Sequence, residues 1–359
     1  MTVKRLLVGA LVTVLLLVGL IVAFRGQIIE RMFPRMVEQL MVRDRIAELG
    51  EGIHVLMCGT GTPMPDPNRA GPCTIIIAGD EVVMVDAGTG GVRVAQMMGA
   101  PLPKLDALFL THLHSDHIDG LGETLLQAWV GGTRTEPFPV YGPTGTNEVV
   151  DGFNAAYSID HGYRVAHHGE GVVPMSGAGG DGREFETPTV GADRVVYSSG
   201  GLEVRAFKVE HDPVHDAVGY RFDYRGRSIV ISGDTDYAPE IARVAKGVDL
   251  LIHEALQPNM VEVMRDAAER ANRPTIAHIM DDILDYHASP EEAAQVASDA
   301  GVGMLLFHHT IPPIPSPSIN PLFLGEAPEI YDGPIVVAVD GMVFTLPFEG
   351  GEIRQSNLL

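Results

Sequence analysis

Cysteine is scarce in this sequence. Its 359 residues include only Cys58 and Cys73, which excludes a disulfide-rich framework and a zinc site built from thiolates. Both cysteines fall in strand-like segments, where we expect buried thiols. A single bridge between them is the alternative in an oxidising compartment.

Positive charge is also in short supply. Lysine and arginine together number 25 against 47 aspartates and glutamates, which gives a formal net charge of −22. Proteins that bind nucleic acid usually present a basic face, because contacts to phosphate supply most of the affinity. Residues 131–200 hold four arginines, no lysine and nine acidic residues, so this segment offers no basic arm. The charge balance therefore argues against a nucleic-acid partner.

The longest apolar run lies at the N-terminus. Thr13 is the only polar side chain in residues 6–24, and about 20 apolar residues suffice to span a bilayer. The run is longer than the core of a cleavable signal, and no cleavage site of small residues follows it. We interpret residues 1–25 as an uncleaved single-pass anchor in the lipid bilayer, with a signal peptide as the alternative.

Basic residues lie on both sides of this apolar run, so they do not predict a single orientation in the membrane. Lys4 and Arg5 favour a cytoplasmic N-terminus. Three arginines lie on the other side within the counted window: Arg25, Arg31 and Arg35. A short tail before the anchor and a large domain after it favour a catalytic domain outside the cytoplasm, on the periplasmic side.

The rest of the chain divides by composition into three parts. Apolar residues at helical spacing predict a helical stalk over residues 26–52, kinked or interrupted at Pro34. Short strand-like segments, hairpins and later helices predict one layered α/β domain over residues 53–348. Within it, the segment 131–200 is rich in glycine and proline, and we expect it to shape the substrate entrance. Residues 349–359 form a C-terminal tail.

A cluster of polar side chains follows the apolar run 107–110, which predicts a buried strand. The stretch Thr111–His117 holds three histidines and one aspartate. Burying these groups without partners would cost several kcal/mol each, by rough estimate. Divalent metal ions are suitable partners, and two ions fit the spacing better than one. His112 and His114 can reach one ion, while Asp116 and His117 can reach the other.

Three further polar positions stand at strand ends. His211 follows the alternating segment 202–209, Asp234 follows 228–233, and the pair His308-His309 follows 303–307. Strand ends hold ligands on a rigid scaffold, which a catalytic metal site needs. Together with the Thr111–His117 stretch, they make four such positions in one chain, which indicates that they share one site.

These motifs together carry a family resemblance. Residues 53–315 resemble the metallo-β-lactamase fold hydrolases, and His112-x-His114-x-Asp116-His117 matches the signature of that family. Within it the chain looks like the ribonuclease Z branch, and more closely its arylsulfatase-like members. The resemblance implies a four-layer αββα metallo-β-lactamase fold, preceded here by the transmembrane helix. The motifs that carry it are Gly59–Pro63, Val85–Gly88, Ser232–Thr235, His253–Ala255, Arg69–Pro72, Thr135–Pro143 and Val209–Tyr220.

The resemblance also implies a ligand set for two zinc ions, with Mn²⁺ or Fe as alternatives. One ion takes His112, His114 and His211, the other takes Asp116, His117 and His309, and Asp234 bridges the two. His309 is preferred to His308 because Pro312 reproduces the His-x-x-Pro spacing of the family. Asp86, at the end of another strand, is expected to orient a ligand imidazole.

The expected reaction is hydrolysis. Two cations a few ångströms apart can hold a bridging hydroxide at neutral pH, which attacks an electrophilic centre. We expect Asp116, His287 and Glu254 to be catalytic, with His287 donating a proton to the leaving oxygen or binding the anion, and Glu254 orienting it. His287 precedes Ser289 and Glu292, which are spaced as a helix capping box. The residues that contact substrate are unassigned.

These observations favour a membrane-anchored dinuclear zinc hydrolase of a small ester, and we expect that ester to be an aryl sulfate. The alternatives are a phosphodiesterase or tRNA 3′-processing endonuclease of the ribonuclease Z type, a lactonase, and a non-catalytic membrane scaffold. The complete ligand set argues against the scaffold. The expected partners are a small-molecule ester and the lipid bilayer, and a homodimer is an open alternative.

Overall fold

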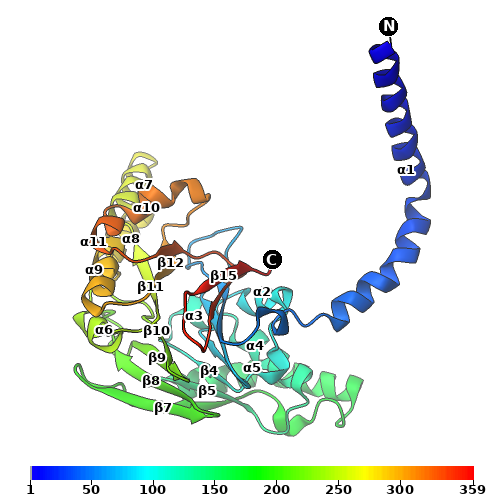
Figure 1. The fold of residues 1–359 in the computed structure, drawn as a ribbon. Coiled ribbons are helices and arrows are strands. Elements are labelled where there is room, and N and C mark those ends of the chain that lie inside the picture. The colour runs from blue at the N-terminus through cyan, green and yellow to red at the C-terminus, as the bar shows by residue number, and fades with distance from the viewer. Residues whose placement is uncertain (1) are drawn as a thin grey trace. The chain divides into compact units, whose positions relative to one another are not determined.

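The structure, a computed structural model, describes residues 2–359 but not the side chains of residues 2–6, 8, 12 and 40–42. Met1 and those side chains, which belong to the expected anchor and stalk, lie outside the described residues. The chain divides into two compact units, Met1–Glu48 and Leu49–Leu359. Figure 1 shows the elements of both units in chain order.

The first unit is built on one helix, α1 (Thr2–Val42). The expected interruption at Pro34 does not occur, because the helix continues through this proline. Within its span Gly9–Gln39, an 18-residue window reaches a mean hydropathy of 2.3, and none of that window is buried. The helix is therefore long and apolar enough to cross a membrane, a test that a signal sequence would also pass.

The second unit contains two β-sheets. The first has eight strands in the order β15 (Arg354–Asn357), β14 (Met342–Leu346), β1 (Ile53–Gly59), β2 (Cys73–Ala78), β3 (Glu81–Val85), β4 (Ala107–Phe109), β5 (Phe138–Gly142) and β6 (Gly180–Glu184). The second has seven in the order β13 (Ile335–Val337), β12 (Leu305–Ile311), β11 (Leu250–Leu256), β10 (Arg227–Ile231), β9 (Val218–Tyr224), β8 (Leu202–Lys208) and β7 (Asp193–Ser199).

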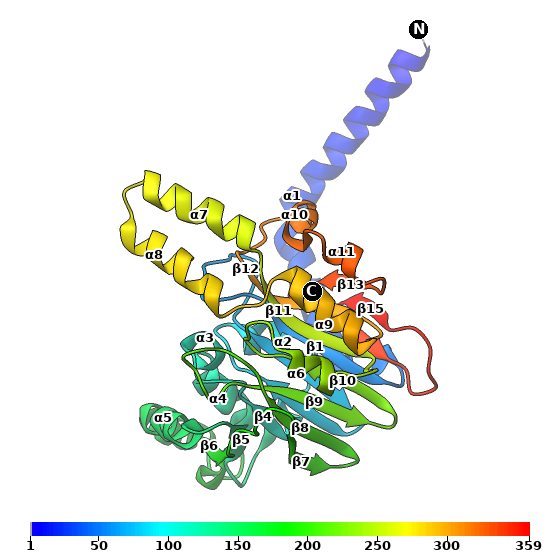
Figure 2. The same cartoon turned by 90° about the vertical axis from the view of Figure 1, so that its left-hand side faces the viewer.

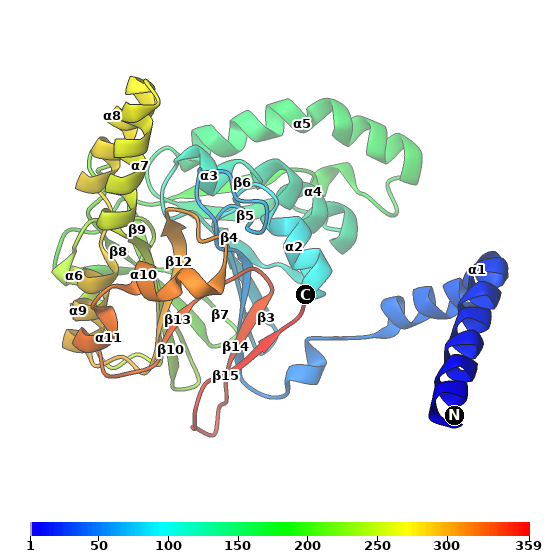
Figure 3. The same cartoon turned by 90° about the horizontal axis from the view of Figure 1, so that it is seen from above.

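The two sheets face each other across one apolar core. Phe109 of β4 lies 5.4 Å from Tyr220 and 6.0 Å from Phe222, both on β9, between ring centroids. Helices cover the outer faces, as Figures 2 and 3 show from two further sides. Over the first sheet lie α2 (Gly91–Met98), α4 (Leu121–Gly132) and α5 (Thr146–His168). Over the second lie α6 (Pro239–Val244), α9 (Pro290–Ala300), α10 (Asn320–Leu324) and α11 (Ala327–Ile330). The predicted α/β fold is confirmed.

Parallel strands bring the polar strand ends to one edge of each sheet. β3, β4 and β5 run parallel in the first sheet, and β10, β11 and β12 run parallel in the second. Because parallel strands end on the same side, residues that follow them meet there. Asp86 and the Thr111–His117 stretch follow strands of the first sheet at this edge, and Asp234 follows β10 of the second. His309 lies near the end of β12, where its register against β11 shifts.

The segment 131–200 forms part of the scaffold. It contributes β5, α5, β6 and β7 to the layers described above. Taken alone, the local sequence pattern of this segment predicts a helix only over 149–157 and a loop over 175–182. Instead, α5 spans 23 residues, and β6 pairs in parallel with β5. Asn154 of α5 fixes the start of β6, donating to the Gly180 carbonyl at 2.9 Å and accepting from the Gly180 amide at 2.8 Å.

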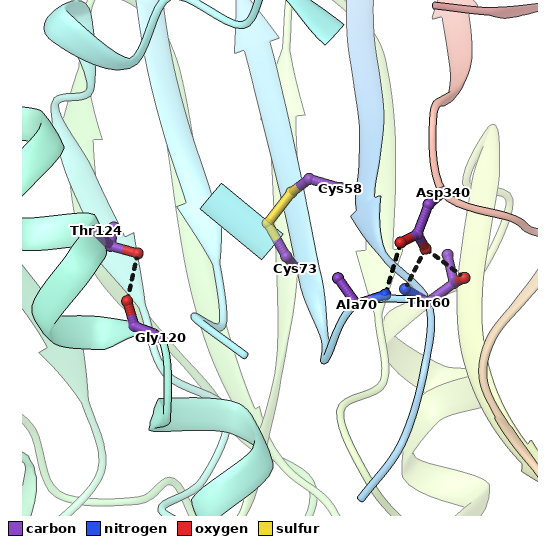
Figure 4. Close-up of a disulfide and its surroundings, with 7 residues drawn as sticks. All are labelled: Cys58, Thr60, Ala70, Cys73, Gly120, Thr124 and Asp340. Carbon is purple, nitrogen blue, oxygen red and sulfur yellow. Dashed lines mark hydrogen bonds between the residues drawn. A yellow bond between two sulfur atoms is a disulfide. The ribbon is translucent and has the colours of Figure 1, made fainter. Parts of the chain in front are cut away.

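Cys58 and Cys73 form a disulfide between β1 and β2 (Figure 4). The expectation of two free thiols is therefore wrong, and the alternative bridge is the one observed. A bulge in β1 explains the pairing. The register of β1 against β2 shifts between Met57 and Gly59, which brings Cys58 beside Cys73. The bond closes the base of the loop that joins these strands.

Candidate metal centre

The centre is built on the turn that follows β4. The short helix α3 (Ser115–Ile118) begins there, and His114 precedes it in extended conformation. The His117 amide donates to the His114 carbonyl at 3.1 Å. This turn directs His112, His114, Asp116 and His117 to one side, where His211, Asp234 and His309 arrive from the second sheet.

Two groups of ligand atoms meet at this point. In the first, His112 Nε2 lies 2.9 Å from His114 Nδ1, which lies 3.3 Å from His211 Nε2. In the second, Asp116 Oδ2 lies 3.5 Å from His117 Nε2 and 3.2 Å from His309 Nε2. All these atoms belong to buried side chains, except those of His114, which is exposed.

Asp234 lies between the two groups. Its Oδ2 is 3.9 Å from His112 Nε2, 3.3 Å from His117 Nε2 and 3.4 Å from His309 Nε2. His117 Nε2 is buried and makes no hydrogen bond with any described residue. An imidazole nitrogen left without a hydrogen bond beside two carboxylates suits a divalent cation. The residues present therefore fit a metal centre.

Asp86 fixes the orientation of His117. It directly follows β3 and adopts a positive φ of 55°. Its Oδ2 accepts from His117 Nδ1 at 2.8 Å, and its Oδ1 accepts from the Thr111 amide at 2.9 Å. His211 is held similarly, because its Nδ1 lies 3.0 Å from the Tyr286 carbonyl. In both rings Nε2 is left to face the centre, as in many metal-binding histidines.

His287 and Glu254 form a hydrogen-bonded pair next to the centre. Glu254 Oε1 lies 2.9 Å from His287 Nδ1 and accepts from the Thr235 amide at 3.0 Å. His287 offers a ring nitrogen within 4.8 Å of ligand atoms of Asp234 and His309. The predicted capping box is also present, since Ser289 and Glu292 exchange hydrogen bonds at the start of α9. His287 is thus fixed by the helix that follows it.

Burial and the two central carboxylates set the charge of the imidazoles. Burial lowers the pKa of His112 well below its usual value and that of His211 to about 4. Both rings are therefore neutral at pH 7, which is the form that binds metal. Burial also lowers the pKa of His117, but Asp234 and Asp86 outweigh it and raise that pKa well above its usual value. The negative charge around His117, to which Asp234 contributes most, therefore favours a cation at this point.

A cavity of about 440 Å³ opens over the centre. Its floor includes His114, Asp116, Asp234, His287 and His309. Its walls are Thr62, Pro63, Met64, Pro65, Ile279, Met280, Ile283, Tyr286 and Ile311. Of these, only Thr62 and Pro63 belong to a motif that the sequence analysis named. Residues 62–65 and 279–286 supply most of these walls. Because the two segments are far apart in the chain, no local sequence pattern shows that they line one cavity. No residue of the segment 131–200, where we expected the entrance, lines this cavity.

Other histidines and the single tryptophan lie elsewhere. His308 is buried on β12, and neither of its ring nitrogens has a hydrogen-bond partner among the described side chains and backbone. Its neighbour His309 is the one that reaches the centre, as the spacing to Pro312 predicted. Trp129 is buried in α4 and donates to the Pro174 carbonyl at 2.7 Å. It is therefore a core residue, with His161 packed against it at 5.1 Å between ring centroids.

The geometry agrees with sequence comparisons. A profile of the beta-lactamase superfamily domain matches residues 81–310. Ribonuclease Z of Mycolicibacterium gilvum (strain PYR-GCK) is 37% identical over 262 residues, which are 72% of this chain and 85% of that protein. Ribonuclease Z of Mycobacterium marinum (strain ATCC BAA-535 / M) is 38% identical over 264 residues, 73% and 88% of the two chains. The chain belongs to the ribonuclease Z branch of the metallo-β-lactamase superfamily.

Solved structures of the superfamily have the same fold. The short form of human tRNase Z (ELAC1) matches with a TM-score of 0.58 and 20% identity, over 82% of this chain and 99% of that one. The metallo-beta-lactamase fold protein YhfI from Bacillus subtilis matches with a TM-score of 0.54 and 19% identity, over 85% and 100%. As a member of this superfamily the chain is a metal-dependent hydrolase.

Membership of the ribonuclease Z branch corrects two predictions. The expected aryl sulfate substrate is wrong, because the relatives at 37% and 38% identity are ribonucleases. The exclusion of nucleic acid is wrong for the same reason. A net charge of −22 describes the whole surface and not the site. Asp86, Asp116 and Asp234 contribute to that sum, although they are buried where cations would neutralise them.

Proposed function

We propose that this protein is a metal-dependent endoribonuclease of the ribonuclease Z type, which cleaves a phosphodiester bond at the 3′ end of a tRNA precursor. One observation carries the proposal. In a chain of this branch, all seven expected ligands meet at one centre beside the His287–Glu254 pair, and a cavity opens over that centre. A site that had lost its chemistry could lose any of these residues without penalty.

We assign two metal ions to the seven ligands. His112, His114 and His211 would hold one ion. Asp116, His117 and His309 would hold the other, and Asp234 would contact both. Zinc fits the imidazole-rich set best, with Mn²⁺ or Fe as alternatives. When bound, the two ions would supply positive charge to the phosphate oxygens and a hydroxide nucleophile at neutral pH.

The side chains of the cavity supply the proton transfers. Asp116 lies on the floor of the cavity, where its carboxylate is placed to accept a proton from the attacking water. His287 faces the same cavity, and its Nδ1 is engaged by Glu254 at 2.9 Å. Its Nε2 is thus free to protonate the 3′ oxygen as the bond from that oxygen to phosphorus breaks. Glu254 acts as a positioning residue, because it touches His287 and not the substrate.

A second candidate function is favoured by the Cys58–Cys73 bond. Disulfides persist in oxidising compartments, and tRNA precursors are found in the cytoplasm. If α1 anchors the second unit outside the cytoplasm, as its apolar window allows, the same centre would act on small phosphodiesters. The side of the membrane on which the second unit lies therefore decides between the two candidate functions. Fusions of alkaline phosphatase and of a cytoplasmic reporter after Leu359 would identify that side.

The proposed function is tested with three substrates of the metal-loaded protein. We expect cleavage of a tRNA precursor with a 3′ trailer, hydrolysis of bis-p-nitrophenyl phosphate, and no turnover of p-nitrophenyl sulfate. The His114→Ala variant should be inactive on all three. Diester hydrolysis without precursor cleavage would support the second candidate instead. Lack of activity on every phosphodiester would overturn both.

A further inference from the structure

The walls of the active-site cavity are apolar, although its floor is polar. One wall is the β1–β2 loop with Pro63, Met64 and Pro65, and the other runs from Ile279 to Tyr286. Ile279 belongs to α8 (Pro274–Asp282), which pairs with α7 (Pro258–Arg270) as a helical hairpin (Figure 2). All lining residues are described, and none of them is lysine or arginine. The cavity therefore has no cationic side chain with which to bind further phosphates.

The two walls meet at the back of the cavity. A small apolar cluster joins them, made of Leu256, Val261, Met280, Ile283 and Ile311, with Met64, Leu284 and Tyr286 packed against it. The front is left open, because the Ile279 side chain is 47% exposed. A large apolar side chain that faces solvent beside a catalytic centre is a natural contact for an apolar ligand group.

The β1–β2 loop holds its wall in a fixed position. At its base are the Cys58–Cys73 bond and the hydrogen bond from the Gly61 amide to the Ala70 carbonyl at 2.8 Å. The carboxylate of Asp340 accepts from the Thr60 amide at 3.0 Å and from the Ala70 amide at 2.7 Å (Figure 4). A wall that is already ordered costs little entropy when a ligand binds against it.

The loop is also tied by a buried arginine. Arg69 Nη1 donates to Thr60 Oγ1 at 2.8 Å and to the Ala338 carbonyl at 2.6 Å. Its Nε lies 3.7 Å from Asp66 Oδ2, and both side chains are only 4% exposed. The proline-rich wall segment 62–65 lies between these fixed points. Its shape is therefore set before any substrate arrives.

Tyr286 links the apolar walls to the chemistry. Its ring centroid lies 4.9 Å from that of His287 and 5.3 Å from that of His211. Its hydroxyl makes no hydrogen bond with any described residue, and burial raises the pKa of that hydroxyl. The ring is half-buried, so one part of it is available to a ligand. A group that contacts Tyr286 is next to the imidazole that protonates the leaving oxygen.

We propose that the cleft between residues 62–65 and 279–286 binds the flat aromatic ring of the leaving group, which in RNA is the base of the nucleotide that keeps the 3′ oxygen. This inference rests on the proposed phosphodiesterase activity of the same centre. Stacking on Tyr286 and apolar contact with Ile279 and Met64 would hold the ring. Base stacking on an aromatic side chain typically contributes about tenfold or more in affinity, and it tolerates every base.

The cleft is tested by binding, without turnover. Phenylphosphonate and methylphosphonate carry the same anionic group, and only the first has a ring. By calorimetry on the metal-loaded full chain, we expect phenylphosphonate to bind about tenfold tighter. Ile279→Ala and Tyr286→Ala should each reduce that preference at least threefold, while Tyr286→Phe should keep it. Ile276→Ala is the matched control, since Ile276 is an exposed α8 residue outside the cavity.

The outcomes separate this inference from the proposed function. Hydrolysis of bis-p-nitrophenyl phosphate with equal affinity for the two phosphonates would leave the function standing and overturn the cleft. A ring preference without hydrolysis of any diester would support the cleft and overturn the function. If Tyr286→Ala unfolds, as far-UV circular dichroism would show, the exposed Ile279→Ala decides. A loss in Ile279→Ala no larger than that in Ile276→Ala would contradict the cleft.

Discussion

Among single residues, His287 gives the sharpest test of mechanism. A general acid matters most when the leaving oxygen is a poor leaving group. We therefore expect His287→Ala to lower kcat on RNA by about 10²–10⁴-fold, a typical contribution of general acid–base catalysis. The loss on bis-p-nitrophenyl phosphate should be much smaller, because p-nitrophenolate leaves without protonation. Steady-state kinetics on both substrates would measure the two losses.

His278 supplies the control for this experiment. It is an exposed histidine of α8 and lies outside the active-site cavity. His278→Ala should leave kcat on both substrates unchanged. Equal losses on RNA and on the aryl diester in His287→Ala would show that His287 binds metal or supports the fold and does not protonate the leaving group.

Asp86 should affect metal affinity more than it affects the fold. It is the acceptor for His117 Nδ1 at 2.8 Å, and partners of this kind typically change metal affinity by about 10–100-fold. We expect Asp86→Ala to lose metal at a correspondingly lower chelator concentration, measured by elemental analysis after dialysis. Asp80→Ala, in the exposed turn between β2 and β3, should retain wild-type metal content. Retention of metal by Asp86→Ala would refute this role.

The ligand set could be predicted residue by residue, but the substrate contacts could not. His112, Asp234 and His309 each follow a recognisable apolar strand, so a local pattern marked them. Met64 and Ile279 look like ordinary apolar residues, and they become cavity walls only because the fold brings the β1–β2 loop to α8. The aryl sulfate prediction failed for the same physical reason. Ligands at strand ends determine the attacking group, and distant segments determine what fits beside it.

Among the elements, the β1–β2 loop depends most on covalent support. Cys58 and Cys73 are separated by 15 positions, and closing a loop of this length typically stabilises a protein by about 2–4 kcal/mol. The Cys58→Ser/Cys73→Ser variant should therefore unfold at a lower urea concentration, with a free energy of unfolding reduced by about that amount. Urea titration followed by circular dichroism would measure it.

Reduction of the wild type provides the matching control. Dithiothreitol should lower the stability of the wild-type protein to that of the double variant and should not affect the double variant. An unchanged unfolding midpoint in both cases would mean that the Asp340 and Arg69 contacts hold the loop without the bond.

The helix α5 shows why element boundaries were harder to predict than strand ends. Only Thr146, Val150 and His161 are buried along its 23 residues, so most of the helix lacks a periodic apolar pattern. Its ends are set by glycines instead, with Gly145 at φ 98° before it and Gly169 at φ 80° after it. A helix prediction that relies on apolar periodicity therefore finds only the part of α5 that packs on the sheet.

In the whole molecule, the net negative charge is compatible with the proposed action on RNA, because the charge of the surface and the charge of the metal centre differ. The acidic residues that dominate the net charge of −22 repel a polyanion at a distance, but two divalent ions would reverse the sign at the centre. The cavity itself lacks lysine and arginine among its lining residues. Under the proposed function, recognition there would come from the ions and from apolar contact with a base, as we propose for the cleft.

The two units should be separable in function. The apolar clusters described for the second unit begin at Ile53, so residues 49–359 contain a core of their own. We expect this fragment to fold, bind metal and hydrolyse bis-p-nitrophenyl phosphate with an unchanged kcat. The full chain should partition into the detergent phase of a Triton X-114 extraction, and the fragment should stay in the aqueous phase.

The contrast between these two measurements assigns a role to α1. Its exposed apolar residues, such as Leu15 at 61% and Leu20 at 60%, would be covered by lipid if α1 is an anchor and would be removed if α1 is a signal sequence. Mass spectrometry of the protein recovered from membranes distinguishes the two, because an anchor keeps its N-terminal residues. If the fragment lost kcat while remaining folded and metal-loaded, α1 would support catalysis as well as attachment, and the separation of the two units would be wrong.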